Sequence, residues 1–209
     1  PDRCAHGIGV DDLNGDDKDD VAIGTYGGVT ATVMLGSGTG TFGSPVAYSA
    51  SGNPHDVAIA DFNEDGNPDL VTADESSNQI SVFLGTASGT YGPRTTYAAA
   101  FEPKGVTTGD LNGDGNTDIA VASAGRNYPV TTEPGGDLVT VWLGNGSGSF
   151  SSGGRFGGFT APESLFDVAI GDLNGDGVGD LAASNWHSGN ISIFFGASAG
   201  GPRATFTTD

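Results

Sequence analysis

The chain has 209 residues, with 37 glycines, one cysteine, and 26 acidic residues against 7 basic ones, for a formal net charge of −19. Apolar residues are spread along the whole chain, which excludes collagen-like and disordered classes. The acidity argues against binding to nucleic acid or anionic membrane surfaces, because both need clustered Lys and Arg. The single Cys4 excludes an internal disulfide, and no stretch is long and apolar enough to predict insertion into a membrane.

Four Asp-rich segments recur along the chain, and each stands between two short apolar runs. They begin at Asp12, Asp61, Asp110 and Asp172, so the intervals are 49, 49 and 62 residues. Most of the extra length in the last interval falls near residues 124–137. A fixed period near 50 residues predicts a repeat architecture, in which each repeat is one supersecondary unit.

Each repeat predicts four β-strands in the same order. In the second repeat, an apolar run at 57–60 precedes the Asp-rich segment, and runs at 70–73, 80–84 and 91–97 follow it. Gly, Asn, Asp and Pro separate the runs, and no segment predicts a helix. Four strands per repeat are typical of β-propeller blades. The predicted fold is therefore all-β, a propeller of four-stranded antiparallel blades. We place the blades at residues 6–53, 54–102, 103–164 and 165–209.

The Asp-rich segments have the composition and spacing of calcium loops. Side-chain oxygens at positions 1, 3, 5 and 9 and a carbonyl at position 7 can surround Ca²⁺, which prefers six to eight oxygen ligands. Gly at position 6 permits a left-handed turn, although Asp17 stands there in the first loop. A metal-free Asp-Gly turn is the alternative, but four such loops would crowd unneutralised carboxylates. The predicted ligands of about four structural Ca²⁺ ions are Asp12, Asn14, Asp16, Lys18, Asp20, Asp61, Asn63, Asp65, Asn67, Asp69, Asp110, Asn112, Asp114, Asn116, Asp118, Asp172, Asn174, Asp176, Val178 and Asp180.

The repeated pattern Val-Ala-x-Gly-Asp-Leu-Asn-Gly-Asp-Gly-x-x-Asp-Leu-Ala-Val, followed by Val-x-Leu-Gly-x-Gly-x-Gly-x-Phe, resembles the VCBS/FG-GAP repeat family. That family includes integrin α-subunit propellers, fungal propeller lectins and exported bacterial proteins. The likeness runs from His6 to about Phe206, with departures at Asp17 and Ser151. It implies a secreted or cell-surface, calcium-binding propeller with an adhesion or lectin-like function.

The number of repeats leaves the closure of the ring open. Complete propellers of this family resemble seven-bladed rings, whereas this chain has four repeats. The four blades are therefore a fragment of a larger ring, or one part of a ring that a second chain completes, or a four-bladed ring closed on itself.

A ligand-binding face is predicted opposite the Asp-rich loops, where the joins between second and third strands emerge. Tyr26, Glu75 and Trp186 occupy equivalent positions there, and the insertion of the third repeat falls in the same join. Loops on a rigid scaffold commonly carry recognition, and aromatic rings beside polar groups can stack on sugars. The alternative is that Tyr26 and Trp186 only cover blade edges. The candidate ligand-binding residues are Tyr26, Glu75, Arg126, Tyr128, Trp186 and His187.

No catalytic motif is present, neither a nucleophile elbow nor an HExxH pattern. We therefore predict a non-enzyme without catalytic residues, and with Ca²⁺ as its only cofactor. The expected partners are a glycan, an extracellular protein, or another chain that completes the propeller. The alternatives are a structural or assembly module, and a non-catalytic propeller attached to an exported polysaccharide-degrading enzyme.

Overall fold

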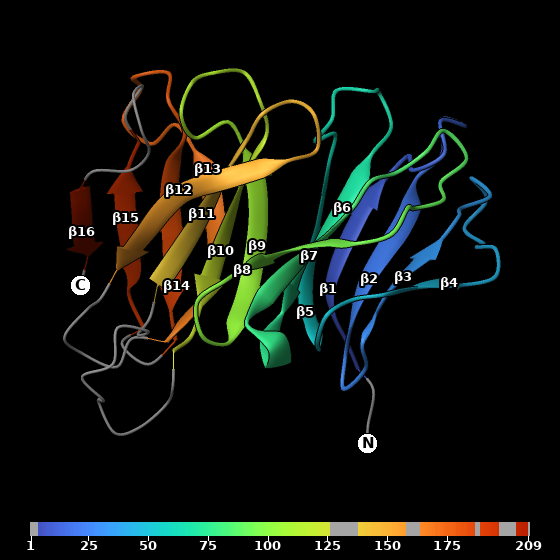
Figure 1. Ribbon diagram of the computed structural model, residues 1–209, viewed down its shortest axis with the longest axis horizontal. Coiled ribbons are helices and arrows are strands. Elements are labelled where there is room, and N and C mark those ends of the chain that lie inside the picture. The colour runs from blue at the N-terminus through green and yellow to red at the C-terminus, as the bar shows by residue number, and fades with distance from the viewer. Residues whose placement is uncertain (1–3, 126–137, 158–163, 187–188, 197–203, 209) are drawn as a thin grey trace.

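The computed structural model describes residues 4–125, 138–157, 164–186, 189–196 and the backbone of 204–208. It contains four four-stranded antiparallel sheets, one for each repeat, which confirms the predicted all-β class and the blade architecture (Figure 1). Each sheet keeps its strands in chain order from first to fourth. Among the helices described, none is long and apolar enough to cross a membrane.

The strands divide evenly among the four blades. Blade 1 contains β1 (Cys4–Asp11), β2 (Asp20–Tyr26), β3 (Thr30–Met34) and β4 (Val46–Ser49), and blade 2 contains β5 (Pro54–Ala60), β6 (Asp69–Asp74), β7 (Gln79–Phe83) and β8 (Thr95–Ala98). Blade 3 contains β9 (Pro103–Gly109), β10 (Asp118–Ser123), β11 (Leu138–Gly144) and β12 (Phe150–Gly157), and blade 4 contains β13 (Leu165–Gly171), β14 (Asp180–Asn185), β15 (Ile191–Phe195) and β16 (Ala204–Thr208).

One short 3₁₀ helix, η1 (Glu75–Ser77), lies in the join between β6 and β7, where the sequence predicted no helix. Asn78 ends it in the left-handed conformation, with φ of 55°, and its N–H donates to the Glu75 carbonyl. Asn tolerates this conformation better than most residues, which is why a turn too short to leave a periodic pattern forms here.

The first strands β1, β5, β9 and β13 lie side by side and place the blades in a row, with blades 1 and 4 at opposite ends (Figure 1). The row does not close into a ring. Each pair of neighbouring blades encloses one apolar cluster. Between blades 1 and 2, for example, Leu13 and Val33 pack with Val57 and Phe83. The core therefore lies between blades, and each blade depends on its neighbour for burial.

Aromatic side chains seal the outer part of each interface. A ring from the fourth strand of one blade contacts a ring of the next blade, as Tyr97 contacts Trp142 with 5.2 Å between centroids. Tyr48 meets Tyr91 at the same distance. Trp142 is partly buried against the cluster between blades 2 and 3.

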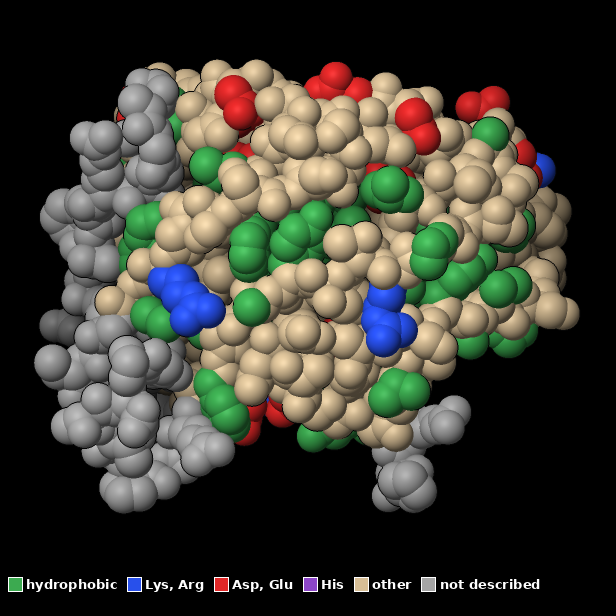
Figure 2. Space-filling view, viewed as in Figure 1, with side chains coloured by type: hydrophobic (Ala, Val, Ile, Leu, Met, Phe, Trp, Pro, Cys, Tyr) green, Lys and Arg blue, Asp and Glu red, His purple; other side chains and the backbone are tan. Residues whose placement is uncertain are grey.

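The first hairpin of every blade has the same register. Asp11 pairs with Asp20, and Ala60, Gly109 and Gly171 pair with the corresponding Asp69, Asp118 and Asp180. The Asp-rich segments are therefore the loops between first and second strands. All four loops lie at one edge of the row, at the top of Figure 1, and acidic side chains gather along this edge in Figure 2. The second strands run to the opposite edge, where the joins between second and third strands of blades 1 and 2 lie.

Candidate functional site

The ninth residue of each Asp-rich loop is a fully buried aspartate that binds two backbone amides. The Asp20 carboxylate accepts hydrogen bonds from the Leu13 N–H at 3.0 Å and from the Gly36 N–H at 2.6 Å. It thereby ties the loop to the turn after the third strand. The same two contacts, at 2.6–2.9 Å, are made by Asp69 with Phe62 and Gly85, by Asp118 with Leu111 and Gly144, and by Asp180 with Leu173 and Gly196.

Burial makes the charged form of two of these carboxylates, Asp69 and Asp118, costly. It raises the pKa of Asp118 to about 6, and the two backbone N–H groups offset it only in part. The pKa of Asp69 is raised for the same reason. A cation in the loop would favour the charged form and oppose this shift.

The first aspartate of each loop organises the turn. Asp12 accepts hydrogen bonds from the backbone N–H groups of residues 14, 15, 16 and 17, at 2.6–3.3 Å. Asp172 does the same in the fourth loop, and backbone donors, Gly177 foremost, lower the pKa of its carboxyl. Asp17 has φ of 62°, so the first loop adopts the left-handed turn without the glycine of the other loops.

The donor chemistry of the loops fits calcium. Each loop offers exposed Asp and Asn oxygens, backbone carbonyls and the buried ninth carboxylate, which keeps about two of its four lone-pair sites. Hard cations such as Ca²⁺ prefer an all-oxygen set. Within the described ranges, no group of three or more His, Cys, Asp or Glu side chains lies close enough together to hold a metal. Calcium binding would therefore draw the loop oxygens closer together.

The opposite edge carries a pocket of about 370 Å³, lined by the first strands of all four blades. His6, His55, Lys104 and Phe166 occupy equivalent positions near the start of the first strand of each repeat, and all four line this pocket. The pocket therefore gathers one side chain from every blade, and its chemistry varies among the blades.

Five aromatic rings form a continuous row at this pocket. His6 stacks on Tyr26 with 4.6 Å between centroids and an interplanar angle of 4°. His55 meets His6 edge-on at 4.6 Å and Phe166 at 5.3 Å. Phe166 in turn contacts Trp186 at 5.2 Å. We call Tyr26, His6, His55, Phe166 and Trp186 the aromatic row. The Trp186 side chain at its end is 68% exposed.

Charged groups stand beside the aromatic row. Lys104 of β9 forms an ion pair with Glu75 of η1, and both side chains are largely buried. Burial lowers the pKa of His55 to about 4, with Lys104 and His6 adding to the effect and Glu75 opposing it. A hydrogen bond to the Lys104 backbone also opposes the shift, and the other ring nitrogen of neutral His55 can accept a hydrogen bond.

The structure brings three of the six predicted ligand-binding residues to this site. Tyr26 and Trp186 belong to the aromatic row, and Glu75 pairs with Lys104 next to it. Arg126, Tyr128 and His187 lie outside the described residues.

Sequence reasoning missed the four first-strand residues that line the pocket. His6, His55, Lys104 and Phe166 could have been found as the position at which otherwise similar first strands differ most in chemistry. Their convergence depends on how neighbouring blades pack, which the repeat pattern alone does not give.

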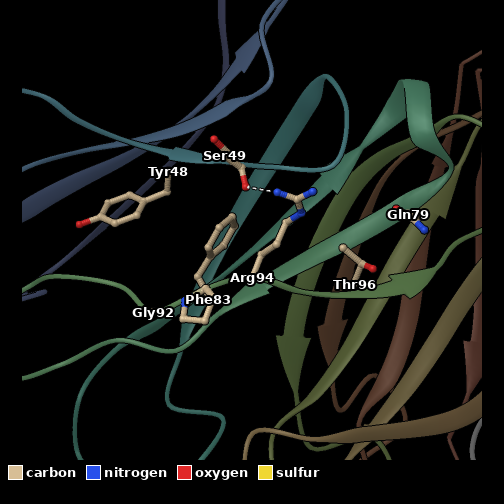
Figure 3. A pocket seen from close by; sticks show the side chains of 8 residues that line it. Tyr48, Ser49, Gln79, Phe83, Gly92, Arg94 and Thr96 are labelled. Atoms are coloured by element: carbon tan, nitrogen blue, oxygen red, sulfur yellow. Dashed lines mark hydrogen bonds between the residues drawn. The ribbon is translucent and has the colours of Figure 1, made fainter.

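A second pocket, of about 530 Å³, lies between the outer strands of blades 1 and 2 (Figure 3). Tyr48, Phe83 and Arg94 line it, and the Arg94 guanidinium donates to the Ser49 carbonyl at 3.0 Å. These rings belong to the aromatic contacts between blades, so the pocket is the outer end of a structural interface.

Blades of this kind, with Asp-rich loops at one edge and variable joins at the other, define a β-propeller repeat protein. A model of the FG-GAP-like repeat matches residues 12–72, 61–121 and 110–183. The chain therefore belongs to the FG-GAP-like repeat family, as its motifs predicted. No curated protein sequence matches it.

Solved structures share the fold at low sequence identity. An Agrocybe aegerita lectin that recognises non-reducing terminal N-acetylglucosamine is 18% identical, with a TM-score of 0.59 over 95% of this chain and 50% of the lectin. BBS1N, solved in complex with ARL6DN, is 10% identical, with a TM-score of 0.57 over 97% of this chain and 57% of BBS1N. The NanB sialidase from Streptococcus pneumoniae is 12% identical, with a TM-score of 0.53 over 89% of this chain and 26% of the sialidase. The chain thus spans about half of the first two.

Proposed function

We propose that the protein is a non-catalytic glycan-binding module and that the aromatic row is its binding site. The observation that supports this most is the continuous row of five rings beside a pocket that all four blades line. Ring faces pack against the apolar faces of sugars, while the neighbouring His55, Lys104 and Glu75 can hydrogen-bond to hydroxyl groups. The lectin of similar fold, which recognises terminal N-acetylglucosamine, adds support for a sugar ligand.

Calcium belongs to this proposal as a structural cofactor. About four Ca²⁺ ions would occupy the Asp-rich loops at the edge opposite the aromatic row, held by the all-oxygen donors described above. The ions would neutralise loop carboxylates and brace the first hairpin of each blade, and they would take no part in ligand contact. Extracellular calcium is high enough to load weak sites of this class, which favours a secreted or cell-surface location.

Protein binding is the second candidate, and the exposure of Trp186 favours it. A large exposed aromatic side chain is a common anchor of protein interfaces. BBS1N, which has a similar fold, was solved in complex with another protein. The related alternatives are an assembly module and a non-catalytic propeller within an exported polysaccharide-degrading enzyme.

A glycan array with the wild-type chain and two variants tests the proposal. Trp186→Ala should lower binding to the preferred glycan by about tenfold, equivalent to about 1.4 kcal/mol. Phe42→Ala is the matched control, because Phe42 is also an exposed aromatic residue but lies in the turn between β3 and β4. Absence of any glycan bound by the wild type, or equal binding by Trp186→Ala, would contradict glycan recognition at the aromatic row.

A further inference from the structure

The outer strands of the blades lack acidic residues, although the chain as a whole is strongly acidic. No Asp or Glu occurs in residues 21–55, 76–101, 138–162 or 181–208, which contain the third and fourth strands of all four blades. Figure 2 shows two basic side chains in the middle of one face, whereas acidic side chains gather at its edges. At physiological ionic strength, exposed charges more than about 8 Å apart are largely screened from each other. The charge at this face is therefore set mainly by its own side chains.

Arg94 stands immediately before β8 and lines the pocket of about 530 Å³ between blades 1 and 2 (Figure 3). Its guanidinium donates to the Ser49 carbonyl of blade 1 at 3.0 Å, so the side chain reaches from one blade to the other. No carboxylate is among the described residues that line the pocket, and Arg94 forms no ion pair with any of the described residues. A guanidinium has five N–H donors. Ser49 accepts from one of them, which leaves four for a ligand.

Polar and aromatic groups surround this guanidinium. Figure 3 shows Arg94 between the Tyr48 ring on one side and the Gln79 and Thr96 side chains on the other. Tyr48 contacts the buried Phe83 ring with 6.3 Å between centroids, which fixes the position of the Tyr48 ring at the pocket. Within the part of the chain that the structure describes, neither the Gln79 amide group nor the Thr96 hydroxyl has a hydrogen-bond partner. Both groups therefore remain available to a ligand.

The other blades do not repeat these polar groups. Gly153 of blade 3 and Pro45 of blade 1 stand at the position of Arg94, and Leu138 of blade 3 stands at the position of Gln79. Contacts that the blade architecture needs recur in every blade, as those of the ninth-position aspartates do. A guanidinium and an amide present in one blade only are not needed for that architecture, so they favour a role in binding.

The chemistry of the pocket fits a ligand that combines a carboxylate with hydroxyl groups. A planar guanidinium binds a carboxylate through two parallel hydrogen bonds, with a geometry that other side chains do not match. An amide group and a hydroxyl can each donate to and accept from sugar hydroxyls. An aromatic ring such as that of Tyr48 can pack against the apolar face of a sugar ring. A sugar that carries a carboxylate has all three features.

We propose that this pocket binds a carboxylated sugar unit of the uronic acid type. Arg94 would bind the carboxylate, Gln79 and Thr96 would bind ring hydroxyls, and the Tyr48 ring would flank the sugar. The pocket shares no lining residue with the pocket beside the aromatic row. This second site is therefore independent of the glycan binding proposed for the aromatic row.

Titrations with matched ligands test the proposal on the wild-type chain by NMR. Methyl glucuronide and methyl glucoside differ only at the carboxylate, and the backbone amide signals of Gly92 and Arg94 report binding at the pocket. The glucuronide should bind with a Kd of about 1 mM, and the glucoside about tenfold more weakly, because it loses the charge-assisted hydrogen bonds. Sodium acetate should also bind about tenfold more weakly, because it has no hydroxyl groups. Absence of a shift with glucuronide, or equal binding of glucuronide and either other ligand, would overturn the proposal.

Variants of the two outer-strand arginines assign the binding to Arg94. Arg94→Gln should weaken glucuronide binding by about tenfold, and Arg94→Lys should weaken it as well, because Lys keeps the charge but lacks the planar fork. Arg155→Gln is the matched control and should bind normally, because Arg155 is also exposed on a fourth strand but does not line the pocket. Unchanged binding by Arg94→Gln, or an equal loss in Arg155→Gln, would contradict the assignment.

Two further measurements separate this site from its alternatives. Circular dichroism spectra like that of the wild type establish that the variants fold, and the comparison of ligands on the wild type needs no variant. Trp186→Ala should leave glucuronide binding unchanged, whereas Arg94→Gln should leave binding at the aromatic row unchanged. Failure of one site is therefore distinguishable from failure of the other. Loss of glucuronide binding in Trp186→Ala would show that the sugar does not bind at Arg94.

Discussion

The two edges of the blade row differ in how closely the four repeats resemble one another. At the Asp-rich edge, the same contacts recur in all four blades, and each ninth-position aspartate binds the same two backbone amides. At the pocket edge, the equivalent positions hold two imidazoles, one ammonium group and one phenyl ring, from His6, His55, Lys104 and Phe166. The repeated contacts serve the stability of every blade, whereas side chains of three different types around one pocket can give specificity for a ligand.

The largest effect should come from calcium at the Asp-rich edge. At a hundredfold excess over Kd, each site would add about 2.7 kcal/mol to the free energy of unfolding, so four sites would raise the melting temperature by about 20 °C or more. Thermal melts followed by circular dichroism in Ca²⁺ and in EDTA measure this. Asp172→Ala should reduce the gain, whereas the exposed Asp19→Ala should leave it unchanged. Identical melting temperatures in Ca²⁺ and in EDTA would show that calcium does not stabilise the Asp-rich loops.

The ninth-position carboxylate should stabilise the fold even without metal. Asp20→Ala leaves the buried Leu13 N–H and the partly buried Gly36 N–H unpaired, which should cost about 3 kcal/mol. Denaturant unfolding in EDTA measures the difference from wild type. Asp19→Ala is again the matched control, because Asp19 is adjacent to Asp20 in the sequence but its side chain is exposed. A loss that appears only in the presence of Ca²⁺ would mean that Asp20 acts through the metal alone.

A somewhat smaller effect should follow from crowding the first strands near the pocket. Gly7→Ala would place a Cβ 2.2 Å from Asp56 Oδ1 and 2.4 Å from the Asp56 Cα, so blades 1 and 2 would have to separate slightly. We expect a loss of about 2 kcal/mol. Gly171→Ala, also in a first strand but with open space around its Cβ, should lose less. Equal stability of the two variants would show that the inner strands pack loosely.

The smallest effect should be a pH dependence from His55. Its pKa in the folded protein is about 4, below the ordinary value of 6.5, so the unfolded chain binds a proton there that the folded protein excludes. Stability should therefore fall as the pH drops through this window, by about 1 kcal/mol between pH 7 and 5.5.

The His55→Phe variant isolates that contribution, because Phe166 shows that a phenyl ring is accommodated at the equivalent position. Lys104, His6 and Glu75 face His55 and are retained in the variant. The difference between the unfolding free energies of wild type and variant should change over this pH range. A constant difference would indicate that His55 is accessible to protons from solvent.

Much of the fold was predictable, because the repeat period and the strand pattern are local properties of the sequence. The Asp-rich segments became hairpin loops in the same register four times, as their spacing predicted. The short helix η1 was missed, since three residues leave no periodicity. Sequence also placed Tyr26 and Trp186 on the edge opposite the loops, because strand direction alternates along the chain.

The candidate site was predictable only in part. Either Trp186 or Glu75 can be assigned to a join between strands from strand order alone. Phe166, the partner of Trp186, comes from the neighbouring strand of the same blade, whereas Lys104, the partner of Glu75, comes from another blade, so that ion pair forms only after the blades pack. The sequence of one blade does not show which of its residues will contact the next blade.

The Asp-rich loops were therefore determined by the sequence alone, because nine consecutive residues contain both the backbone donors and the carboxylates that bind most of them. Tertiary structure decided the gathering of His6, His55, Lys104 and Phe166 at one pocket and the contact of Arg94 with Ser49 of the neighbouring blade. The physical reason is that burial and ring contacts depend on which blade is adjacent. A repeat sequence describes every blade alike, whether a neighbour covers it or not.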